Sequence, residues 1–289
     1  MSTKQRKSTS LWQDAGNRLF KNKAAVVSLG FIIFIVLVAM GADFIAPYSY
    51  DIQNIGNRLA SPGLENLMGT DILGRDILSR IIYGARMSIS VGIITASCSL
   101  IMGTIYGAIS GYIGGRVDNI MMRIVDILYT FPSILLIILV MLFFGRGLVG
   151  IFAGLTIVGW VSVSRIVRGC VLQVKEMSFV EAARSMGIKN YAIVLRHILP
   201  NILGPIIVTL TFEIPQAILS ESFLSFIGLG LQPPFSSWGT LANDGFQAFK
   251  SFPHLIIFPG IAIFLTVLSF NLLGDGLRDA LDPKLKNSG

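Results

Sequence analysis

Two glutamates stand in a long apolar stretch of the chain and are the residues best placed to do chemistry. Glu213 and Glu221 are the only ionisable side chains between positions 201 and 224. A carboxylate at membrane depth is costly and by default faces a cavity or a polar partner. We therefore predict that Glu213 lies on a solute pathway, where it would meet an amino group or form part of a gate. A hydrogen bond to a partner subunit is the alternative. Glu221 is a second pathway candidate, with hydration near the membrane surface as its alternative.

Other patterns that carry chemistry are missing from the sequence. There is no G-x-x-x-x-G-K-[ST] phosphate loop, so the chain is not expected to bind ATP. Its two histidines, His197 and His254, are far apart and lack the spacing of metal ligands. Cys98 lies in an apolar run and Cys170 in a polar segment, so a disulfide is not expected. We therefore predict no catalytic residue, no metal site and no cofactor on this chain.

A polar segment between two apolar runs has the residue pattern of two short helices. It reads EAARSMGIKNYAIVLRHILP, from Glu181 to Pro200. Ser178 precedes Glu181 with the spacing of a capping box, which predicts a helix that starts at this serine. Gly187 suits a left-handed residue that ends this helix. Asn190 would cap a second helix, which the proline would stop. The segment is therefore predicted to form two short helices joined at an angle, a rigid knob that projects from its surroundings.

The elements around this segment have the composition of membrane spans. The chain has 289 residues, of which 53% are hydrophobic and 13% charged, with a mean hydropathy of +0.72; a soluble domain is typically about 25% charged. The apolar runs are continuous rather than alternating, which favours helices over a β-barrel. We predict an all-α membrane protein with six transmembrane helices, at residues 25–46, 88–110, 126–145, 148–166, 201–224 and 255–275.

The basic residues give this arrangement an orientation. The first span follows a tail that contains Lys4, Arg6 and Lys7, and most of the 23 Lys and Arg residues fall on the same side as this tail. Because basic loops stay in the cytoplasm, both termini are predicted to be cytoplasmic. The net charge of +7 and the isoelectric point near 9.6 are explained by these inner loops. No basic run is interleaved with stacking aromatic residues, so a nucleic-acid partner is not predicted.

Small residues recur at four-residue spacing in two of the predicted spans. Gly103, Gly107 and Gly111 form one set, and Gly150 and Gly154 form the other. This spacing is typical of helices that approach one another closely in a membrane.

The segment before the second span contains two pairs of opposite charge. Asp71 and Arg75, and likewise Asp76 and Arg80, are four residues apart. On a helix such pairs contribute a few tenths of a kcal/mol each. We predict helix-stabilising ion pairs here, with a surface that docks a partner as the alternative.

The segment from Glu181 to Pro200 resembles the cytoplasmic EAA loop of binding-protein-dependent ABC importer permeases. His197 stands where the broad pattern favours a branched aliphatic residue, and the ending RHILPN is typical of the oligopeptide, dipeptide and nickel branch, of which the chain resembles the C-type permease. Four further blocks resemble this branch in the expected order: GTDILGRDILSRIIYGARMS, GYIGGRVDNIMMRIVDILYTFPSILL, ESFLSFIGLGLQPPFSSWG and NLLGDGLRDALDPK.

The resemblance implies a type I ABC importer transmembrane domain and a division of the chain. Residues 1–24 would be a cytoplasmic tail, and 25–87 the first span with an outer segment. The permease domain would cover 88–276 and include the coupling loop 167–200. Residues 277–289 would form a second cytoplasmic tail.

The resemblance also implies a function and partners. The chain would be the permease subunit of an ATP-driven importer in a bacterial inner membrane, forming half of the pathway for oligopeptides or dipeptides, with nickel or another small solute as the alternative. Its partners would be a homologous permease, two ATPases that carry ATP and Mg, an extracytoplasmic binding protein and the lipid bilayer. An ion-coupled secondary transporter is a further alternative, which predicts inverted repeats with paired intramembrane charges.

Site residues follow from the same resemblance. Trp238, in the outer loop 229–254, is a candidate contact for the binding protein. The ATPase-docking residues would be Glu181, Ala182, Ala183, Gly187, His197, Leu199 and Pro200.

Overall fold

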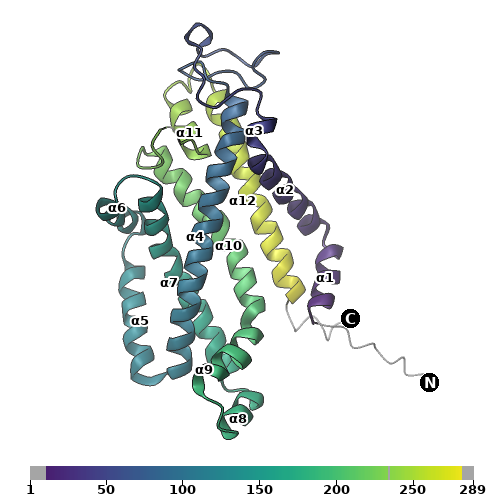
Figure 1. Ribbon diagram of the computed structural model, residues 1–289, viewed down its shortest axis with the longest axis vertical. Helices are drawn as coiled ribbons and strands as arrows, with labels where there is room; N and C mark the ends of the chain where they lie inside the picture. Colours follow the sequence, from purple (N-terminus) through teal and green to yellow (C-terminus); the bar gives the residue numbers. More distant parts are fainter. Residues whose placement is uncertain (1–10, 234, 282–289) are drawn as a thin grey trace, which may run out of the picture.

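The protein is a bundle of long helices that run roughly along one axis (Figure 1). The computed structural model describes residues 11–233 and 235–281, and the regular elements there are helices, which confirms the all-helical prediction. Parts of both predicted tails, including Lys4, Arg6 and Lys7, lie outside the described residues. The elements are α1 (Leu11–Lys21), α2 (Lys23–Met40), α3 (Ala42–Ile45), the 3-10 turn η1 (Ile55–Asn57), α4 (Ile77–Ile113), α5 (Gly115–Thr130), α6 (Ser133–Phe144), α7 (Leu148–Val174), α8 (Ser178–Ser185), α9 (Asn190–Ile193), the π-helical turn η2 (Val194–Ile198), α10 (Leu199–Phe226), α11 (Trp238–Phe246) and α12 (His254–Leu281).

Five helices of the described residues are long and apolar enough to cross a membrane, and a bent pair, α5 and α6, would make a sixth span. Several of them are longer than the sequence predicts. Helix α4 has 37 residues and is therefore about 55 Å long, well beyond the ~30 Å of a hydrocarbon core. The predicted span 88–110 is only its inner part. The bundle thus continues beyond the apolar belt of the membrane.

The third predicted span is wrong as a single helix. Residues 126–145 contain a break at Phe131 and Pro132, where α5 and α6 meet at 97°. Proline lacks an amide hydrogen and disfavours helical geometry at the residue before it. Phe131 accordingly adopts an extended conformation, with ψ of 139°. The hydropathy of the run does not reveal this break, because hydropathy carries no information on the direction of a helix axis.

Helices α4 and α7 pack along much of their length on the predicted glycines. A Cβ atom at Gly103 would lie 2.5 Å from the Cβ of Val163, and one at Gly107 would lie 2.4 Å from the carbonyl oxygen of Ser164. Such distances leave no room for a side chain. The prediction of closely packed helices is therefore confirmed for this set.

The outer segment before α4 departs from the predicted helix. Asp76 caps α4 instead of pairing with Arg80. Arg80 turns to Asp71 at 2.6 Å and to Asp244 of α11 at 3.1 Å. The pair of Asp71 and Arg75 forms at 2.7 Å as predicted, but in a turn and not on a helix. These charges thus join the outer segment to α4 and α11 in place of supporting one helix.

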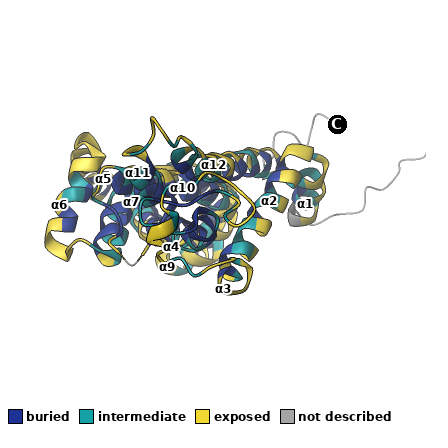
Figure 2. Cartoon of the chain, turned by 90° about the horizontal axis from the view of Figure 1, so that it is seen from above, coloured by how far each residue is buried: buried dark blue, intermediate teal, exposed yellow. Residues whose placement is uncertain are grey.

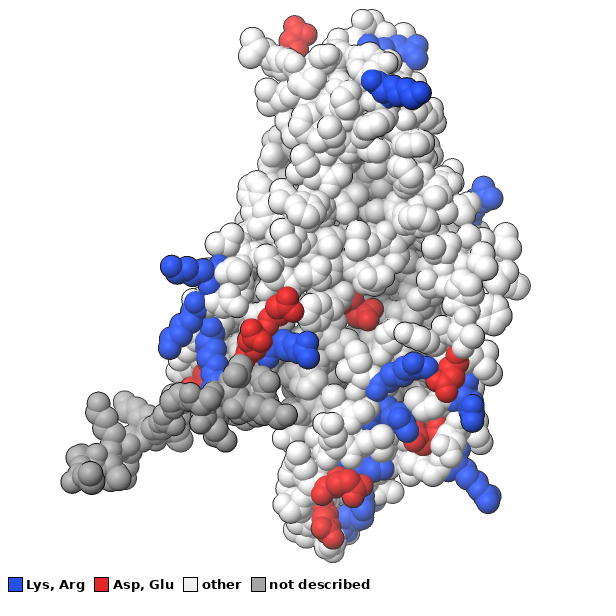
Figure 3. Space-filling view, turned by 180° about the vertical axis from the view of Figure 1, so that it is seen from behind, with Lys and Arg blue, Asp and Glu red and all other residues white. Residues whose placement is uncertain are grey.

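Burial and charge divide the molecule along and across its axis. Seen from above, the buried residues gather where α4, α7, α10 and α12 meet, while α5 and α6 at one edge are largely exposed (Figure 2). Charged side chains gather toward the end that carries α8, and the face seen in Figure 3 has a broad belt with few charges above them. Helix α1 and the end of α12 lie toward this same end (Figure 1). This distribution is the one expected of a multi-pass membrane protein.

Candidate functional site

The segment that follows α7 forms a knob at the end of the bundle, made of α8 and α9 (Figure 1). We call residues 178–193 the knob. Its first helix starts without the predicted capping box. Met177 is the N-cap residue in an extended conformation, Ser178 is already helical, and no side chain caps the helix. The serine therefore lies one position too far along the chain to act as the cap.

The joint between the two helices is built as predicted. Gly187 has φ of +74°, a left-handed conformation that is strained for residues with a Cβ atom. Its amide donates to the carbonyl of Arg184 at 3.0 Å, and the amide of Ile188 donates to the carbonyl of Ala183 at 3.2 Å. These two bonds form a Schellman motif and satisfy the last carbonyls of α8.

The second helix of the knob does not stop at Pro200. Helix α9 passes through the π-helical turn η2 directly into α10, and the proline lies in the first turn of that helix. The amide of Leu199 reaches back to the carbonyl of Val194, a five-residue step. This wider turn provides space for the proline ring, which would clash with the carbonyl four residues earlier in a regular α-helix. The prediction that proline ends the helix was therefore wrong.

Asn190 also has a different role from the one predicted. Lys189 is the N-cap residue of α9, and no side chain caps this helix. The Oδ1 atom of Asn190 instead accepts a hydrogen bond from the hydroxyl of Tyr112 on α4, at 2.9 Å. The asparagine thus ties the knob to the end of a neighbouring span.

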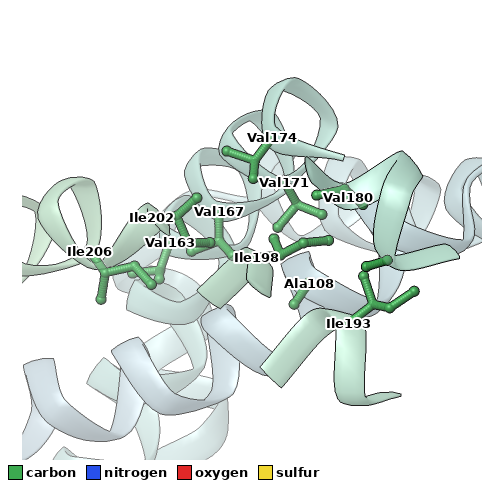
Figure 4. Packing of buried hydrophobic residues seen from close by; sticks show 11 residues of the cluster. Ala108, Val163, Val167, Val171, Val174, Val180, Ile193, Ile198, Ile202 and Ile206 are labelled. Atoms are coloured by element: carbon green, nitrogen blue, oxygen red, sulfur yellow. The ribbon is translucent and has the colours of Figure 1, made fainter. Parts of the chain in front are cut away.

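The knob is anchored by an apolar cluster that reaches into three spans (Figure 4). Val180 and Ala183 of α8 are at most 1% exposed, as are Ile193 of α9 and Ile198 of η2. They pack with buried residues of α4, α7 and α10. Because one close-packed cluster holds all these elements, the knob cannot move without its neighbours.

The opposite face of the knob is open. Glu181 and Ala182 are exposed, and Met186 and Tyr191 are 73% and 65% exposed. Gly187 and Pro200 are exposed as well, whereas His197 and Leu199 are half-buried. Glu181 takes part in no ion pair among the described residues. The predicted docking residues therefore divide into an anchoring set, led by Ala183, and an exposed set, led by Glu181.

A clamp that the sequence does not reveal holds α5 to α7. The guanidinium of Arg168 donates from Nε and Nη2 to the two carboxylate oxygens of Asp118, each at 2.6 Å. Ser110 of α4 donates to the same carboxylate. Nearby, the Lys175 ammonium donates to the carbonyl of Gly111 at 2.9 Å. A single sequence holds no signal for pairs fifty residues apart, so these contacts could not be predicted.

Glu213 lies beside two cavities of the helix bundle. We call outer the cavity of about 280 Å³ that lies among α4, α6, α7 and α10. We call inner the cavity of about 820 Å³ that lies among α1, α7, α10 and α12 and extends toward the knob end. Glu213 lines both cavities and is half-buried. This position agrees with the expectation that an intramembrane carboxylate faces a cavity.

Glu221 is not a pathway residue in this structure. It is 0% exposed and lines neither cavity. Its Oε1 atom accepts hydrogen bonds from Ser225 at 2.6 Å and from Ser237 at 2.7 Å. Since Ser237 is the N-cap residue of α11, this carboxyl group joins α10 to α11. Both the pathway and the hydration alternatives are thereby corrected.

Trp238 offers no surface to a partner. Its side chain is 0% exposed, and its Nε1 atom donates to the carbonyl of Ile81 on α4 at 3.0 Å. It packs with Ala85, Leu241 and Leu255 in the apolar cluster at the outer end. The prediction of a direct contact is therefore wrong for this side chain, whereas docking on other parts of the loop 229–254 stays a prediction.

Comparison with known proteins gives a consistent result along the chain. Residues 103–287 match the family described as binding-protein-dependent transport system inner membrane component, and residues 10–62 match the N-terminal TM domain of oligopeptide transport permease C. The oligopeptide transport system permease protein OppC of Bacillus subtilis (strain 168) is 47% identical over 281 residues, which cover 97% of this chain and 92% of the relative.

Two further comparisons extend this result. The dipeptide transport system permease protein DppC of the same Bacillus strain is 47% identical over 283 residues, covering 97% of this chain and 88% of the relative. Among solved structures, the MetNI methionine ABC transporter in inward facing conformations has a TM-score of 0.58 at 19% identity, covering 71% of this chain and 98% of that chain. At this identity the similarity concerns the fold.

Proposed function

The chain belongs to the family of binding-protein-dependent transport system inner membrane components, and from that premise we propose that it forms half of the translocation pathway of an ATP-driven importer. The other half would come from a homologous permease. Two ATPase subunits would bind ATP and Mg on the cytoplasmic side, and an extracytoplasmic binding protein would deliver the solute. The chain itself would carry no cofactor.

The observation that carries this proposal is the construction of the knob. Its exposed face has the acidic and apolar residues suited to docking on another protein, with Glu181 free of intramolecular ion pairs among the described residues. Its buried face belongs to the same cluster as α4, α7 and α10. A force applied to the exposed face would therefore reach three spans at once. This is the property that a subunit driven by a separate ATPase requires.

The orientation follows from the position of the knob. If the ATPases dock on it, the knob end is cytoplasmic, and α1 and the end of α12 lie toward this end (Figure 1). Both termini would then be cytoplasmic. The gathering of basic residues at the knob end supports this orientation (Figure 3). The chain would be a multi-pass protein of a bacterial inner membrane.

The transport cycle would couple this knob to the cavities. ATP binding would close the ATPases, turn the inner helix ends through the knob and open the pathway outward to accept solute, and hydrolysis would reset it. Glu213, which lines both cavities, would face the moving solute.

Oligopeptides or dipeptides are the proposed cargo. The support is the 47% identity to an oligopeptide and to a dipeptide permease over nearly the whole chain. Nickel is the alternative cargo. Among the described residues no group of three or more His, Cys, Asp or Glu side chains could hold a metal ion, so no local observation favours nickel.

A substitution at the exposed face of the knob tests the proposal. In the complete complex, Glu181→Ala is expected to keep normal folding, because this side chain is exposed. Co-purification of the ATPases and ATP-dependent peptide uptake into proteoliposomes should both fall about tenfold, the change that 1.4 kcal/mol of docking energy produces.

Glu176→Ala is the matched control. Glu176 is also an exposed glutamate, and it lies just before the knob. This variant should retain both ATPase and uptake. Normal ATPase recovery and uptake with Glu181→Ala would count against docking at this face.

A further inference from the structure

The side chain of Glu213 lies beside two cavities of the helix bundle. Among the residues that the structure describes, it is the one that lines both the outer and the inner cavity. A solute that moved from the outer cavity to the inner one would therefore come close to this side chain. Its charge would act on the cargo at that point.

The outer cavity is lined by one acidic side chain and by no described basic side chain. Apart from Glu213, its described lining is apolar or neutral and includes the polar side chains of Ser99, Ser133 and Gln216. Glu213 forms no ion pair with any described residue. The inner cavity differs, because Arg18 and Arg278 line it together with Asp14. A carboxylate without a counter-charge attracts a cation far more strongly in such a cavity than in water.

The local geometry supplies the further acceptors that an ammonium group needs. A Cβ atom at Gly159 would lie 3.3 Å from Oε2 of Glu213 and 2.5 Å from Oγ of Ser99. The carboxylate and this hydroxyl therefore flank one point of α7 that has no side chain. An ammonium group has three N–H donors, and a carboxylate, a hydroxyl and an amide oxygen can all accept them.

We propose that Glu213, together with Ser99 and Gln216, forms a recognition site for a primary ammonium group, the one at the amino end of a peptide in transit. The inference rests on the proposed function, which supplies the peptide cargo. The outer cavity of about 280 Å³ is near the lower limit of small-molecule pockets, so it accommodates one end of a peptide and not the whole chain. The amino-terminal ammonium is a cation that ordinary peptides share whatever their side chains.

Equilibrium binding to the purified complex tests this site without the preference of the binding protein. The probes are radiolabelled trialanine and N-acetyl-trialanine, which differ in the charge of the amino end. The wild-type complex should bind trialanine at least about tenfold more tightly, as a difference of 1.4 kcal/mol requires. Glu213→Gln should remove this difference by weakening trialanine binding alone. Equal binding of the two probes by the wild type would overturn the proposal.

Two variants separate recognition from a structural role. Glu221→Gln changes a glutamate of the same helix that lines neither cavity, so it should preserve the preference for trialanine. Gly159→Ala should reduce the preference, because its methyl group crowds the Glu213 carboxylate and Ser99. If Glu213 only bonds to the partner permease, Glu213→Gln will alter both probes equally, which refutes the inference.

The proposed function has a separate criterion. It fails if the wild-type complex shows no ATP-dependent peptide uptake, whatever the binding result. Uptake that is normal in the wild type and equally normal for both peptides in Glu213→Gln would refute the ammonium site alone.

Discussion

Two ion pairs join α5 to α7 at different exposures, and this allows burial to be tested as the source of their strength. In the first, which we call the inner pair, Asp118 is 9% exposed and Arg168 is 32% exposed. In the second, which we call the outer pair, Asp126 and Arg165 are 52% and 39% exposed. Both pairs connect the same two helices, so the second is an internal control for the first.

The structure sets different magnitudes for the two couplings. Exposed ion pairs contribute about 0.2–1 kcal/mol, and hydrogen bonds to charged groups about 1.5–3 kcal/mol. The inner pair has two hydrogen bonds of 2.6 Å, but solvent reaches its Arg168 side. After a discount for this screening we expect a coupling of about 1.5–2 kcal/mol for the inner pair and below about 0.5 kcal/mol for the outer pair.

Two double-mutant cycles measure these couplings. The first combines Asp118→Asn with Arg168→Gln, and the second combines Asp126→Asn with Arg165→Gln. Thermal unfolding of the complete complex in one detergent is the assay. For a domain of about 150–250 residues 1 kcal/mol corresponds to about 2–4 °C, and a larger unit shifts less, so the inner cycle should deviate from additivity by up to about 8 °C and the outer by under about 2 °C.

The outer cycle needs one precaution. The guanidinium of Arg165 also lies over the ring of Tyr129, 4.2 Å from its centroid. Its single substitution therefore removes two contacts, but the cycle isolates the pair with Asp126. Equal couplings in the two cycles, or a larger one in the outer cycle, would refute the argument that burial determines their strength.

Two further substitutions test how the outer end and the helix seam are built. Trp238→Ala should destabilise the complex by about 3–5 kcal/mol, because it removes a large side chain that is 0% exposed and leaves a cavity. Thermal unfolding in detergent measures this loss. A variant of normal stability with weakened affinity for the binding protein would instead favour a direct contact. Gly107→Val should separate α4 from α7 and lower the yield of folded complex, because even a Cβ atom there would lie 2.4 Å from the carbonyl oxygen of Ser164. An unchanged yield in size-exclusion chromatography would contradict this close packing.

Local patterns predicted the features that depend on local physics. Gly187 ends α8 in a left-handed conformation because only glycine adopts it without strain, and this property is visible in the sequence. The glycines of α4 predicted close packing for a similar reason. Apolar runs identified the spans, although their ends were missed where helices continue past the membrane, as α4 does. Charge spacing predicted the ion pair of Asp71 with Arg75.

The missed features depend on which residues meet in three dimensions. Asp76 and Arg80 have the spacing of an ion pair, but the helix begins between them and the aspartate becomes its cap. Glu213 and Glu221 look alike in the sequence, yet one faces two cavities and the other accepts a hydrogen bond from Ser237 at the start of α11. Trp238 is an aromatic residue of the kind found in binding surfaces, but its side chain is buried against α4. Side-chain type alone does not separate these roles.

The position of the clamp determines how motion of the knob would reach α5. Helix α5 has few buried residues, and it is bounded by Gly114 and Gly115, with φ of +70° and +58°, and by the break before Pro132. Nonhelical joints at both ends allow a helix to change direction without internal strain. Attachment to α7 would make α5 follow the knob, whereas α6 packs on α7 directly through Ile137 and Met141. Because Asp118 is one of the few buried residues of α5, weakening its clamp should loosen α5 from α7, while α6, a wall of the outer cavity, stays packed on α7.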